Sequence, residues 1–429
     1  MGRQSRTNKK LEAITSKTII MGVDIAKRRQ WARFVDYRGI EIGKAIRFDN
    51  DKSGFETIMA EMEKISKQIS AEKIIVGMEP TGHYWKPLAN YLIKKNIIVV
   101  LVNPYHTKKA QELDDNSQTK SDKKDALTIA KLVKDGRYYE TYLPHDDYAE
   151  LRVLTVSRIS INKRKRSIEN TLTAVLDEYF PEFVTVFKHP YKGKAALQIL
   201  KTCPLPRAIL KMGVDGVLDE VKKVVKKTVG RKKVEQLITA AENSIGVDYG
   251  ESAATFKIQK LVEELELVNK QLEETEKEMA SVLDRIEIGK YLLSIRGLGV
   301  VSLAMCLGET GDPMRFDDAR QMARLAGYNL VENSSGTNVS GTSISKRGRK
   351  NLRSVLYQIS MSMVATNPEM KQLYEYLKTR KENPLKKLQA LVVIGKKVLT
   401  LIFTLSKKKE YYEPAKLFGE VRKNQLCAA

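Results

Sequence analysis

Short apolar runs alternate with helical patterns over the first 104 residues of the chain. Three runs within 18–48 are rich in β-branched and aromatic residues and are separated by charged turns, which predicts three consecutive strands. Apolar residues at helical spacing over 55–65 then predict a helix. KIIVGMEP (73–80) and IIVVLVNP (97–104) predict two further buried strands, with a helix over 83–96 between them.

The predicted order, strand-strand-strand-helix-strand-helix-strand, is that of the ribonuclease H fold, in which helices cover a mixed sheet. The patterns that follow are helical almost throughout. We therefore predict an α/β domain over 1–145, a basic helical and coiled-coil region over 146–290, and a helical domain over 291–429. The fold class is α/β plus all-α.

A long helix and a heptad pattern dominate the middle of the chain. The helix is predicted over 148–180, with a densely basic segment at 158–166, and Pro181 ends it. Residues 181–250 are rich in lysine and are predicted to be helical. Two apolar positions then recur through four heptads flanked by Glu and Lys, which predicts a coiled coil that packs within the chain, braces it or forms a dimer. The two positions hold Ile258, Leu265, Leu272, Met279 and Ile286, and Leu261, Val268, Thr275 and Val282.

The last region combines helices with two polar segments. IRGLG (295–299) predicts a tight turn between helices. It resembles a helix-hairpin-helix turn, whose backbone amides bind phosphate, and a plain helical hairpin is the alternative. NSSGTNVSGTS (333–343) predicts a polar loop. A basic helix start at 345–356 and two apolar helices follow.

The charge of the chain points to a polyanionic partner. The sequence has 75 Lys and Arg against 52 Asp and Glu, a net charge of +23. Nucleic acid is the first interpretation, and a membrane surface is the weaker one. The most hydrophobic stretch, 388–405, is interrupted by Lys396 and Lys397, so we predict a buried helix and no membrane span.

Neither the N-terminal segment nor the cysteines of the chain indicate a secreted protein. The first 17 residues contain no apolar core of a secretion signal, and Arg6 occupies the position where myristoylation needs Ser or Thr. Three distant cysteines exclude a disulfide framework and a Cys-based zinc site. We expect a cytoplasmic protein associated with the nucleoid.

Four carboxylates of the first domain occupy positions suited to catalysis. Asp24 interrupts an apolar strand, and Glu79 ends the fourth strand, which neighbours the first in this sheet order. Asp122 and Asp125 are three residues apart on a predicted helix and share a face. Converging carboxylates bind hard cations such as Mg²⁺, and two ions about 3.5–4 Å apart can hold the attacking and leaving oxygens of a phosphodiester.

Other interpretations of these acids are possible. Asp24 alone could cap a turn or pair with a lysine, and Asp122 and Asp125 could be a solvated helix start. GVDIAK (22–27) also resembles the first phosphate strand of actin-like sugar kinases. Those enzymes need a later Gly-rich phosphate turn, which we do not find in a fitting place. The D…E…DxxD order on these elements favours a catalytic site.

A doubled serine and a basic segment are the candidates for chemistry and for phosphate binding in the last region. Ser334 and Ser335 precede Gly336 in the polar loop. A serine hydroxyl is a weak nucleophile unless a base or metal activates it, so a simple turn is the alternative. Downstream the sequence has cations without an intervening acid, which suits phosphate contact. These are Lys346, Arg347, Arg349 and Lys350.

The combination of motifs resembles the DEDD transposases of the insertion-sequence 110 family over essentially the full length. The matching segments are GVDIAK, VGMEPTGHYW, NPYHTKKA, KSDKKDALTIAKLV, ENTLTAVLDEYFPEF, the stretch 295–330, NSSG and ISKRGRKNLR. The resemblance implies a RuvC-like first domain, a coiled-coil section and a transposase domain with a serine nucleophile. Asp24, Glu79, Asp122 and Asp125 would be the metal-binding tetrad, with Mg²⁺ or Mn²⁺.

The resemblance also implies a mechanism and partners. Ser335, or the adjacent Ser334, would attack DNA and form a covalent phosphoserine linkage. Members act as oligomers, here a dimer or tetramer, on donor and target DNA, and some use a bridge RNA whose loops pair with both DNAs. The Lys-rich residues 181–250 depart most from the family pattern.

We therefore predict a DNA transposase or recombinase that excises and inserts a mobile element by metal-assisted strand exchange. One alternative is a structure-selective nuclease of the Holliday-junction type, in which water replaces the serine as nucleophile. Another is a non-catalytic nucleic-acid-binding scaffold.

Overall fold

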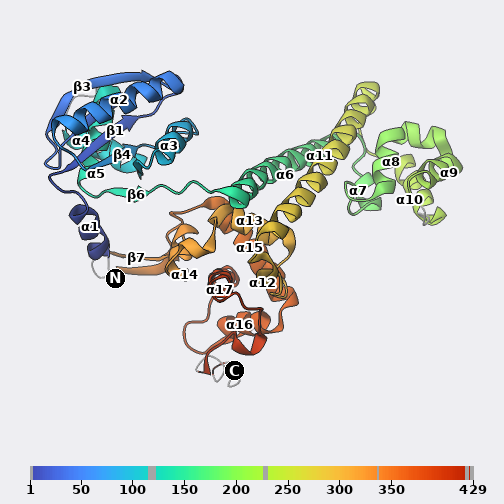
Figure 1. Ribbon diagram of the computed structural model, residues 1–429. Helices are drawn as coiled ribbons and strands as arrows, with labels where there is room; N and C mark the ends of the chain where they lie inside the picture. The colour runs from blue at the N-terminus through green and yellow to red at the C-terminus, as the bar shows by residue number, and fades with distance from the viewer. Residues whose placement is uncertain (1–2, 115–121, 226–229, 336–337, 421–424, 426–429) are drawn as a thin grey trace. The chain divides into compact units, whose positions relative to one another are not determined.

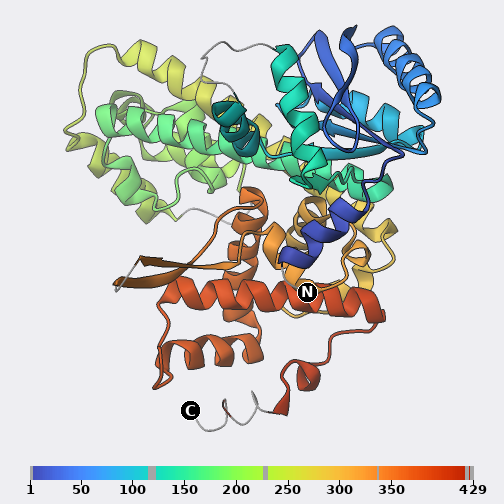
Figure 2. The ribbon, with the colours of Figure 1, turned by 90° about the vertical axis from the view of Figure 1, so that its left-hand side faces the viewer.

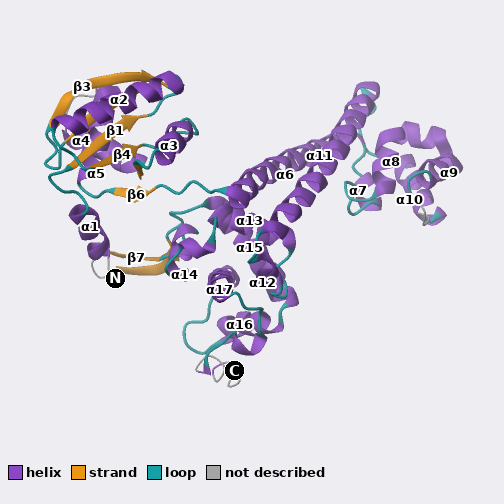
Figure 3. Ribbon diagram, in the orientation of Figure 1, coloured by secondary structure: helices purple, strands orange, loops and turns teal. Residues whose placement is uncertain are grey.

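The protein is described by a computed structural model (Figure 1) that covers residues 3–114, 122–225, 230–335, 338–420 and 425. The chain divides into two compact units, Met1–Leu143 and Pro144–Ala429. The first holds a six-stranded mixed sheet with helices, and the second is helical apart from one pair of strands (Figure 3). The predicted fold class, a ribonuclease-H-like α/β domain followed by helical regions, is confirmed.

The sheet of the first unit has the strand order β3-β2-β1-β4-β5-β6. Strands β1, β4 and β5 are parallel to one another, and β2, β3 and β6 are antiparallel to their neighbours. The meander and the two later strands match the prediction, and the three-residue β6 was not predicted. The strands are β1 (Thr18–Asp24), β2 (Arg29–Val35), β3 (Glu41–Asp49), β4 (Lys73–Met78), β5 (Ile98–Val102) and β6 (Tyr138–Glu140).

Helices cover both faces of this sheet. Alternate residues of β1 point to opposite faces, so Met21 packs with α2 and α3, whereas Ile20 packs with α5. Asp51 caps α2, because its carboxylate accepts the amide of Gly54 at 2.8 Å. The helices are α1 (Arg3–Glu12), α2 (Lys52–Gln68), α3 (Trp85–Lys94), α4 (Pro104–Asp114) and α5 (Asp122–Lys134).

Two long helices, α6 (Asp146–Tyr179) and α11 (Glu251–Arg285), lie side by side in the second unit (Figure 1). Arg158 of α6 and Glu276 of α11 form an ion pair with an N–O distance of 2.6 Å. The heptad residues of α11 pack against helices of the same chain, which corresponds to the intrachain alternative. Beside one end of this pair are the helices α7 (Phe183–Val186), α8 (Lys194–Thr202), α9 (Pro206–Lys222) and α10 (Arg231–Glu242).

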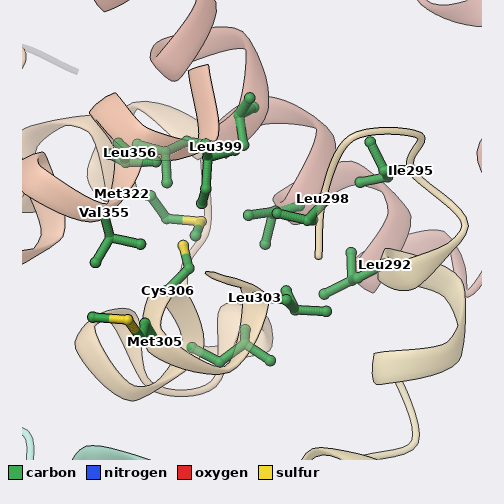
Figure 4. Close-up of a cluster of buried hydrophobic side chains, with 14 of the residues drawn as sticks. Leu292, Ile295, Leu298, Leu303, Met305, Cys306, Met322, Val355, Leu356 and Leu399 are labelled. Carbon is green, nitrogen blue, oxygen red and sulfur yellow. The ribbon is translucent and has the colours of Figure 1, made fainter. Parts of the chain in front are cut away.

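The remaining helices enclose a second core around α13, of which Figure 4 shows Cys306, Met322 and Leu399 among others. They are α12 (Gly289–Leu293), α13 (Val300–Thr310), η1 (Pro313–Arg315), α14 (Ala319–Leu325), α15 (Lys350–Thr366), α16 (Pro368–Thr379), α17 (Lys387–Lys408) and η2 (Pro414–Lys416). Within the described residues, α17 alone is long and apolar enough to cross a membrane, and 50% of its most apolar window is buried. Its buried residues, such as Ile394 and Val398, belong to this core, as predicted for a buried helix.

Within the segment predicted as a polar loop at 333–343, residues 333–335 and 338–343 instead belong to a pair of antiparallel strands. Strands β7 (Leu330–Ser335) and β8 (Asn338–Ile344) pair from Leu330 with Ile344 to Ser335 with Asn338. Figure 2 shows them extending away from the helices of this unit. A strand pair is held by backbone hydrogen bonds, so a run of serine, threonine and asparagine forms it without the apolar alternation used to predict strands.

Candidate active site

Asp24 and Glu79 lie at the carboxyl ends of adjacent parallel strands. Asp24 is the last residue of β1, and Glu79 follows directly after β4. Gly22 pairs with Gly77 and Val23 with Met78, which aligns the two strand ends. The predicted neighbourhood of the first and fourth strands is therefore confirmed.

Both carboxylates belong to the face of the sheet that α5 covers. Ile20 of β1 and Ile75 of β4 pack on this face with residues of α5. Asp24 and Glu79 each follow four residues later, and side chains alternate with a period of two along a strand. Both residues are half-buried, so part of each is in contact with water.

The paired glycines Gly22 and Gly77 let α5 lie directly against this face. A Cβ atom added at Gly22 would lie 2.5 Å from the amide nitrogen of Ala130, and it would meet the carbonyl oxygen of Ala126 as well. A Cβ added at Gly77 would lie 3.2 Å from a methyl group of Ile129. Larger side chains at either position would therefore hold the helix away from the strands.

The direction of α5 places its first turn at the edge with the carboxylates. A Cβ added at Gly39 would lie 3.1 Å from Cδ of Lys134, the last residue of α5. Gly39 is in the turn between β2 and β3, at the amino end of β1, because β2 runs antiparallel to β1. The opposite end of α5, which begins with Asp122 and contains Asp125, therefore lies toward the carboxyl end of β1.

The structure places Asp24, Glu79 and the first turn of α5 at one edge of the sheet, and its described side chains do not form a full ligand set. The side chain of Asp122 lies outside the described residues, and Asp125 is half-buried. Among the side chains that are described, no three His, Cys, Asp or Glu residues form a group that could hold a metal ion. The donor chemistry nonetheless fits Mg²⁺, which takes a few carboxylate oxygens and keeps several waters.

Tyr139 of β6 is a neighbour of this site that the sequence did not suggest. Burial and the nearby negative charge of Glu79 raise the pKa of the Tyr139 hydroxyl above its ordinary value. Tyr139 therefore stays neutral at pH 7. Because β6 has only three residues, it carries too little pattern to be predicted.

The two candidate serines are at the end of β7. Ser334 pairs with Val339 and Ser335 with Asn338, so the backbone of both belongs to the strand pair. Their side chains and residues 336–337, including Gly336, lie outside the described residues. The strand pair, not the predicted loop, therefore carries the candidate nucleophile.

A close backbone contact fixes the base of this strand pair. Gly327 has a φ of 73°, which favours glycine, and its carbonyl accepts hydrogen bonds from the amide of Lys346 at 3.1 Å and from the Ser345 hydroxyl at 3.2 Å. A Cβ added at Gly348 would lie 2.5 Å from the amide nitrogen of Gly327 and 2.5 Å from the carbonyl oxygen of Leu325. The segment after β8 is therefore held tightly against the end of α14.

The four predicted phosphate-binding cations differ in their surroundings. Lys346, Arg347 and Lys350 are exposed. Arg349 is half-buried, and its guanidinium donates to the backbone carbonyl of Glu309 and lies 3.8 Å from the Glu309 carboxylate. Three of the four thus face water, and the fourth ties the segment to α13.

Glu309 is the buried centre of an ion cluster that the sequence analysis missed. Its side chain is 1% exposed and lies 2.6 Å from Nη1 of Arg152 on α6, in addition to its contact with Arg349. The cluster therefore joins α6, α13 and the basic segment before α15. The signal that singled out Asp24, a lone acid in an apolar run, is also present at Glu309 and could have identified it.

The turn at 295–299 is fixed by α15 and by the residue after it. Gly297 has a φ of 95°, and its carbonyl accepts the Ser362 hydroxyl at 3.0 Å. The Asn367 amide donates to the carbonyl of Arg296 at 3.1 Å. The outer side of the turn is open, since Arg296 and Gly299 are exposed.

Comparison with known proteins identifies the family. A family model described as a transposase of the DEDD type of IS110 matches residues 21–181. A second model, described as "Transposase IS116/IS110/IS902 family", matches residues 289–375. The chain belongs to this transposase family. It is therefore an enzyme of DNA phosphoryl transfer that binds DNA, and its DEDD domain implies use of a divalent metal.

Relatives of the transposase extend over most of its length. The protein of insertion element IS116 from Streptomyces clavuligerus is 24% identical over 405 residues, which cover 92% of this chain and 96% of that protein. The IS110 protein of Streptomyces coelicolor is 22% identical over 298 residues, 69% of this chain and 73% of that protein. The IS900 protein of Mycobacterium paratuberculosis is 24% identical over 305 residues, again 69% and 73%.

The two matched segments contain every candidate residue of the transposase. The four carboxylates fall within 21–181, and the two serines and four cations fall within 289–375. Residues 182–288, between the two matches, include the helices α7 to α11.

Proposed function

We propose that this transposase excises and inserts its mobile element by strand exchange through a covalent phosphoserine intermediate, with a bridge RNA as guide. The observation that carries the proposal is the presence of two separate candidate sites in one chain. One is the sheet edge where Asp24, Glu79 and the first turn of α5 meet. The other is the strand pair with Ser334 and Ser335, set on a fixed base beside exposed cations.

The sheet edge is the proposed metal site. Asp24, Glu79, Asp122 and Asp125 would supply carboxylate oxygens to Mg²⁺ or Mn²⁺. When bound, such ions polarise the phosphodiester and lower the pKa of an attacking hydroxyl. The half-burial of Asp24 and Glu79 supports this role, because a hydrated cation and a DNA strand can reach a site that is in contact with water.

The proposed covalent step uses the hydroxyl of Ser335. Its oxygen attacks a DNA phosphorus, the bond from phosphorus to one deoxyribose oxygen breaks, and the serine proton is transferred so that the leaving oxygen departs as a hydroxyl. The hydroxyl of a second strand then attacks the phosphoserine and releases the enzyme. The phosphodiester energy is retained in the ester, so no nucleotide cofactor is needed. Ser334 is the alternative nucleophile.

The proposed partners follow from the exposed cations and from the two candidate sites. Exposed Lys346, Arg347 and Lys350 would contact phosphates of donor and target DNA. Base pairing by the RNA would select sequence, while the protein recognises shape and charge. A homodimer or homotetramer would bring sheet edges and serines together. Such a protein would act in the cytoplasm, on the chromosomal DNA. Its proposed domains are 1–145, 146–290 and 291–429.

Covalent capture of DNA by single-serine variants tests the proposal. The full-length transposase is incubated with its RNA, Mg²⁺ and DNA that carries the element end, and covalent adducts are separated in SDS. We expect Ser335→Ala, or failing that Ser334→Ala, to abolish the adduct, and the control Ser343→Ala on β8 to retain it. Cleavage that persists in both serine variants without an adduct would instead identify the junction-nuclease alternative.

A further inference from the structure

The loop between β1 and β2 is a basic segment at the edge of the sheet that carries Asp24 and Glu79. Ala26, Lys27, Arg28 and Arg29 follow this strand end, and all four are exposed. Because β1 and β2 are antiparallel and adjacent, the loop that joins them lies at the carboxyl end of β1. Three cations therefore lie at the same edge as the carboxylates.

A single side chain ties this loop to the segment after Glu79. The backbone amide of Asn50 donates to the carbonyl of Arg28 at 2.7 Å, and its side-chain amide donates to the carbonyl of Lys27 at 3.3 Å. The same amide donates to the carbonyl of Tyr84 at 3.5 Å. Tyr84 precedes α3, in the segment that leaves β4 through Glu79. Asn50 thus links the two chain segments that leave the carboxylate edge.

Asn50 is itself held on both sides. It follows the last residue of β3, and Asp51, the next residue, caps α2. A Cβ added at Gly54 would lie 2.8 Å from the backbone nitrogen of Asp49, so the start of α2 is pressed against the end of β3. The backbone of the basic loop is therefore supported by a strand and a capped helix.

The three cations of this loop differ in their ion pairs. Arg29 lies 3.8 Å from the carboxylate of Asp49. In the part of the chain that the structure describes, neither Lys27 nor Arg28 forms an ion pair. Exposed cations without an acidic partner beside a carboxylate edge suit an external anion.

We propose that Lys27 and Arg28 form a phosphate-binding rim for the DNA strand that reacts at this edge. The proposal rests on the proposed function and assigns two further substrate-binding residues. Phosphates follow one another at about 3.4 Å of axial rise along one strand. A strand that reacts beside Asp24 therefore brings further phosphates close to the same edge of the sheet, where Lys27 and Arg28 are exposed. Lysine supplies a point charge, and arginine binds phosphate oxygens with two parallel hydrogen bonds.

The salt dependence of DNA affinity measures these contacts directly. Each phosphate that a cation neutralises contributes about 0.9 to the slope of log affinity against log salt concentration. We expect Lys27→Ala/Arg28→Ala in the full-length transposase to reduce that slope by about 1.8. If the variant and wild type bind DNA equally at ~1 M salt, the variant should then bind about 30-fold more weakly than wild type at ~0.15 M salt. The probe is a duplex with the element end, without divalent metal so that it is not cleaved.

A matched control removes two cations from the opposite edge. Lys67 in the last turn of α2 and Lys95 after α3 are exposed and precede strands β4 and β5. They therefore lie at the amino edge of the sheet. We expect Lys67→Ala/Lys95→Ala to leave the slope within about 0.3 of wild type. The charge-preserving Lys27→Arg/Arg28→Lys variant should also keep the wild-type slope, which separates charge from folding.

The outcomes separate this proposal from the proposed function. An unchanged slope in Lys27→Ala/Arg28→Ala, or an equal change in the control, would overturn the rim, even if the covalent adduct still forms. A reduced slope in this variant alone supports the rim, whether or not wild type forms a phosphoserine adduct.

Discussion

Gly22→Ala is the substitution that tests how the carboxylates are brought together. The added Cβ would lie 2.5 Å from the amide nitrogen of Ala130, whereas an ordinary contact is at least 3.4 Å. The shortfall is 3.4 minus 2.5 Å, or 0.9 Å, and the contact with the Ala126 carbonyl is closer still. Both atoms belong to the backbone of α5, so no side-chain rotation relieves the overlap. The helix itself must move away from β1 by about 1 Å.

Two consequences follow from that movement. Overpacking a core costs about 1–3 kcal/mol, and we expect the upper value, about 3 kcal/mol, because backbone atoms clash. A displacement of about 1 Å in a reacting group reduces rates about 100-fold. Because α5 carries Asp122 and Asp125, we expect a 100-fold slower DNA cleavage even where the variant remains folded.

Urea unfolding and single-turnover cleavage at saturating Mg²⁺ measure the two effects. Gly77→Ala should cost less, because its Cβ meets side-chain carbons of Val133 and Ile129, which shift more easily than the backbone of a helix. Gly230→Ala is the control, since no atom of the described residues lies within 4 Å of the added Cβ. Stability within about 0.5 kcal/mol of wild type and unchanged cleavage in Gly22→Ala would refute the placement of α5.

Three further predictions concern the second unit. Glu309→Ala leaves two partly exposed arginines without their buried carboxylate, and we expect the free energy of unfolding to fall by about 2 kcal/mol. An unchanged free energy of unfolding in urea would show that the cluster does not stabilise the protein. Gly348→Ala should push the basic segment off the end of α14 and reduce strand transfer at least tenfold with little change in duplex affinity, which a transfer assay beside a binding titration would show. Burial raises the pKa of Cys306 and of Tyr328 to about 12 each. The unfolded chain loses both protons from about pH 9 to 10 while the folded protein keeps them, so stability should fall as pH rises toward 12, by up to about 1.4 kcal/mol per pH unit and group. Urea unfolding at pH 8 to 11 checks this, and Tyr328→Phe should flatten the slope.

The sequence was sufficient for the strands β1 to β5 of the sheet because these strands carry strong local patterns. The apolar runs at β1, β4 and β5 and their order along the chain predicted a mixed sheet in which Asp24 and Glu79 neighbour each other. A lone acid in an apolar strand is a local signal, and so is a DxxD pair on a helix. These signals need no knowledge of distant contacts.

Features that depend on pairing between distant residues could not be predicted. The role of Gly22 and Gly77 arises only once β1 and β4 are in register and α5 crosses them. The strands that carry Ser334 and Ser335 are polar, so backbone pairing alone reveals them. The cluster joins Glu309 to Arg349, which is 40 positions later in the chain, and to Arg152, which is more than 150 positions earlier.

The central claim is that the carboxylate edge and the serine strand pair act in one reaction. Mass spectrometry of the peptide covalently joined to DNA tests it most directly, in wild type and in Asp24→Asn, with Mg²⁺ and with the metal chelated. We expect a phosphodiester on Ser335 or Ser334 that forms only with intact Asp24 and with metal present. DNA ends released by water with no modified serine peptide, or a serine adduct that forms equally in Asp24→Asn, would contradict it.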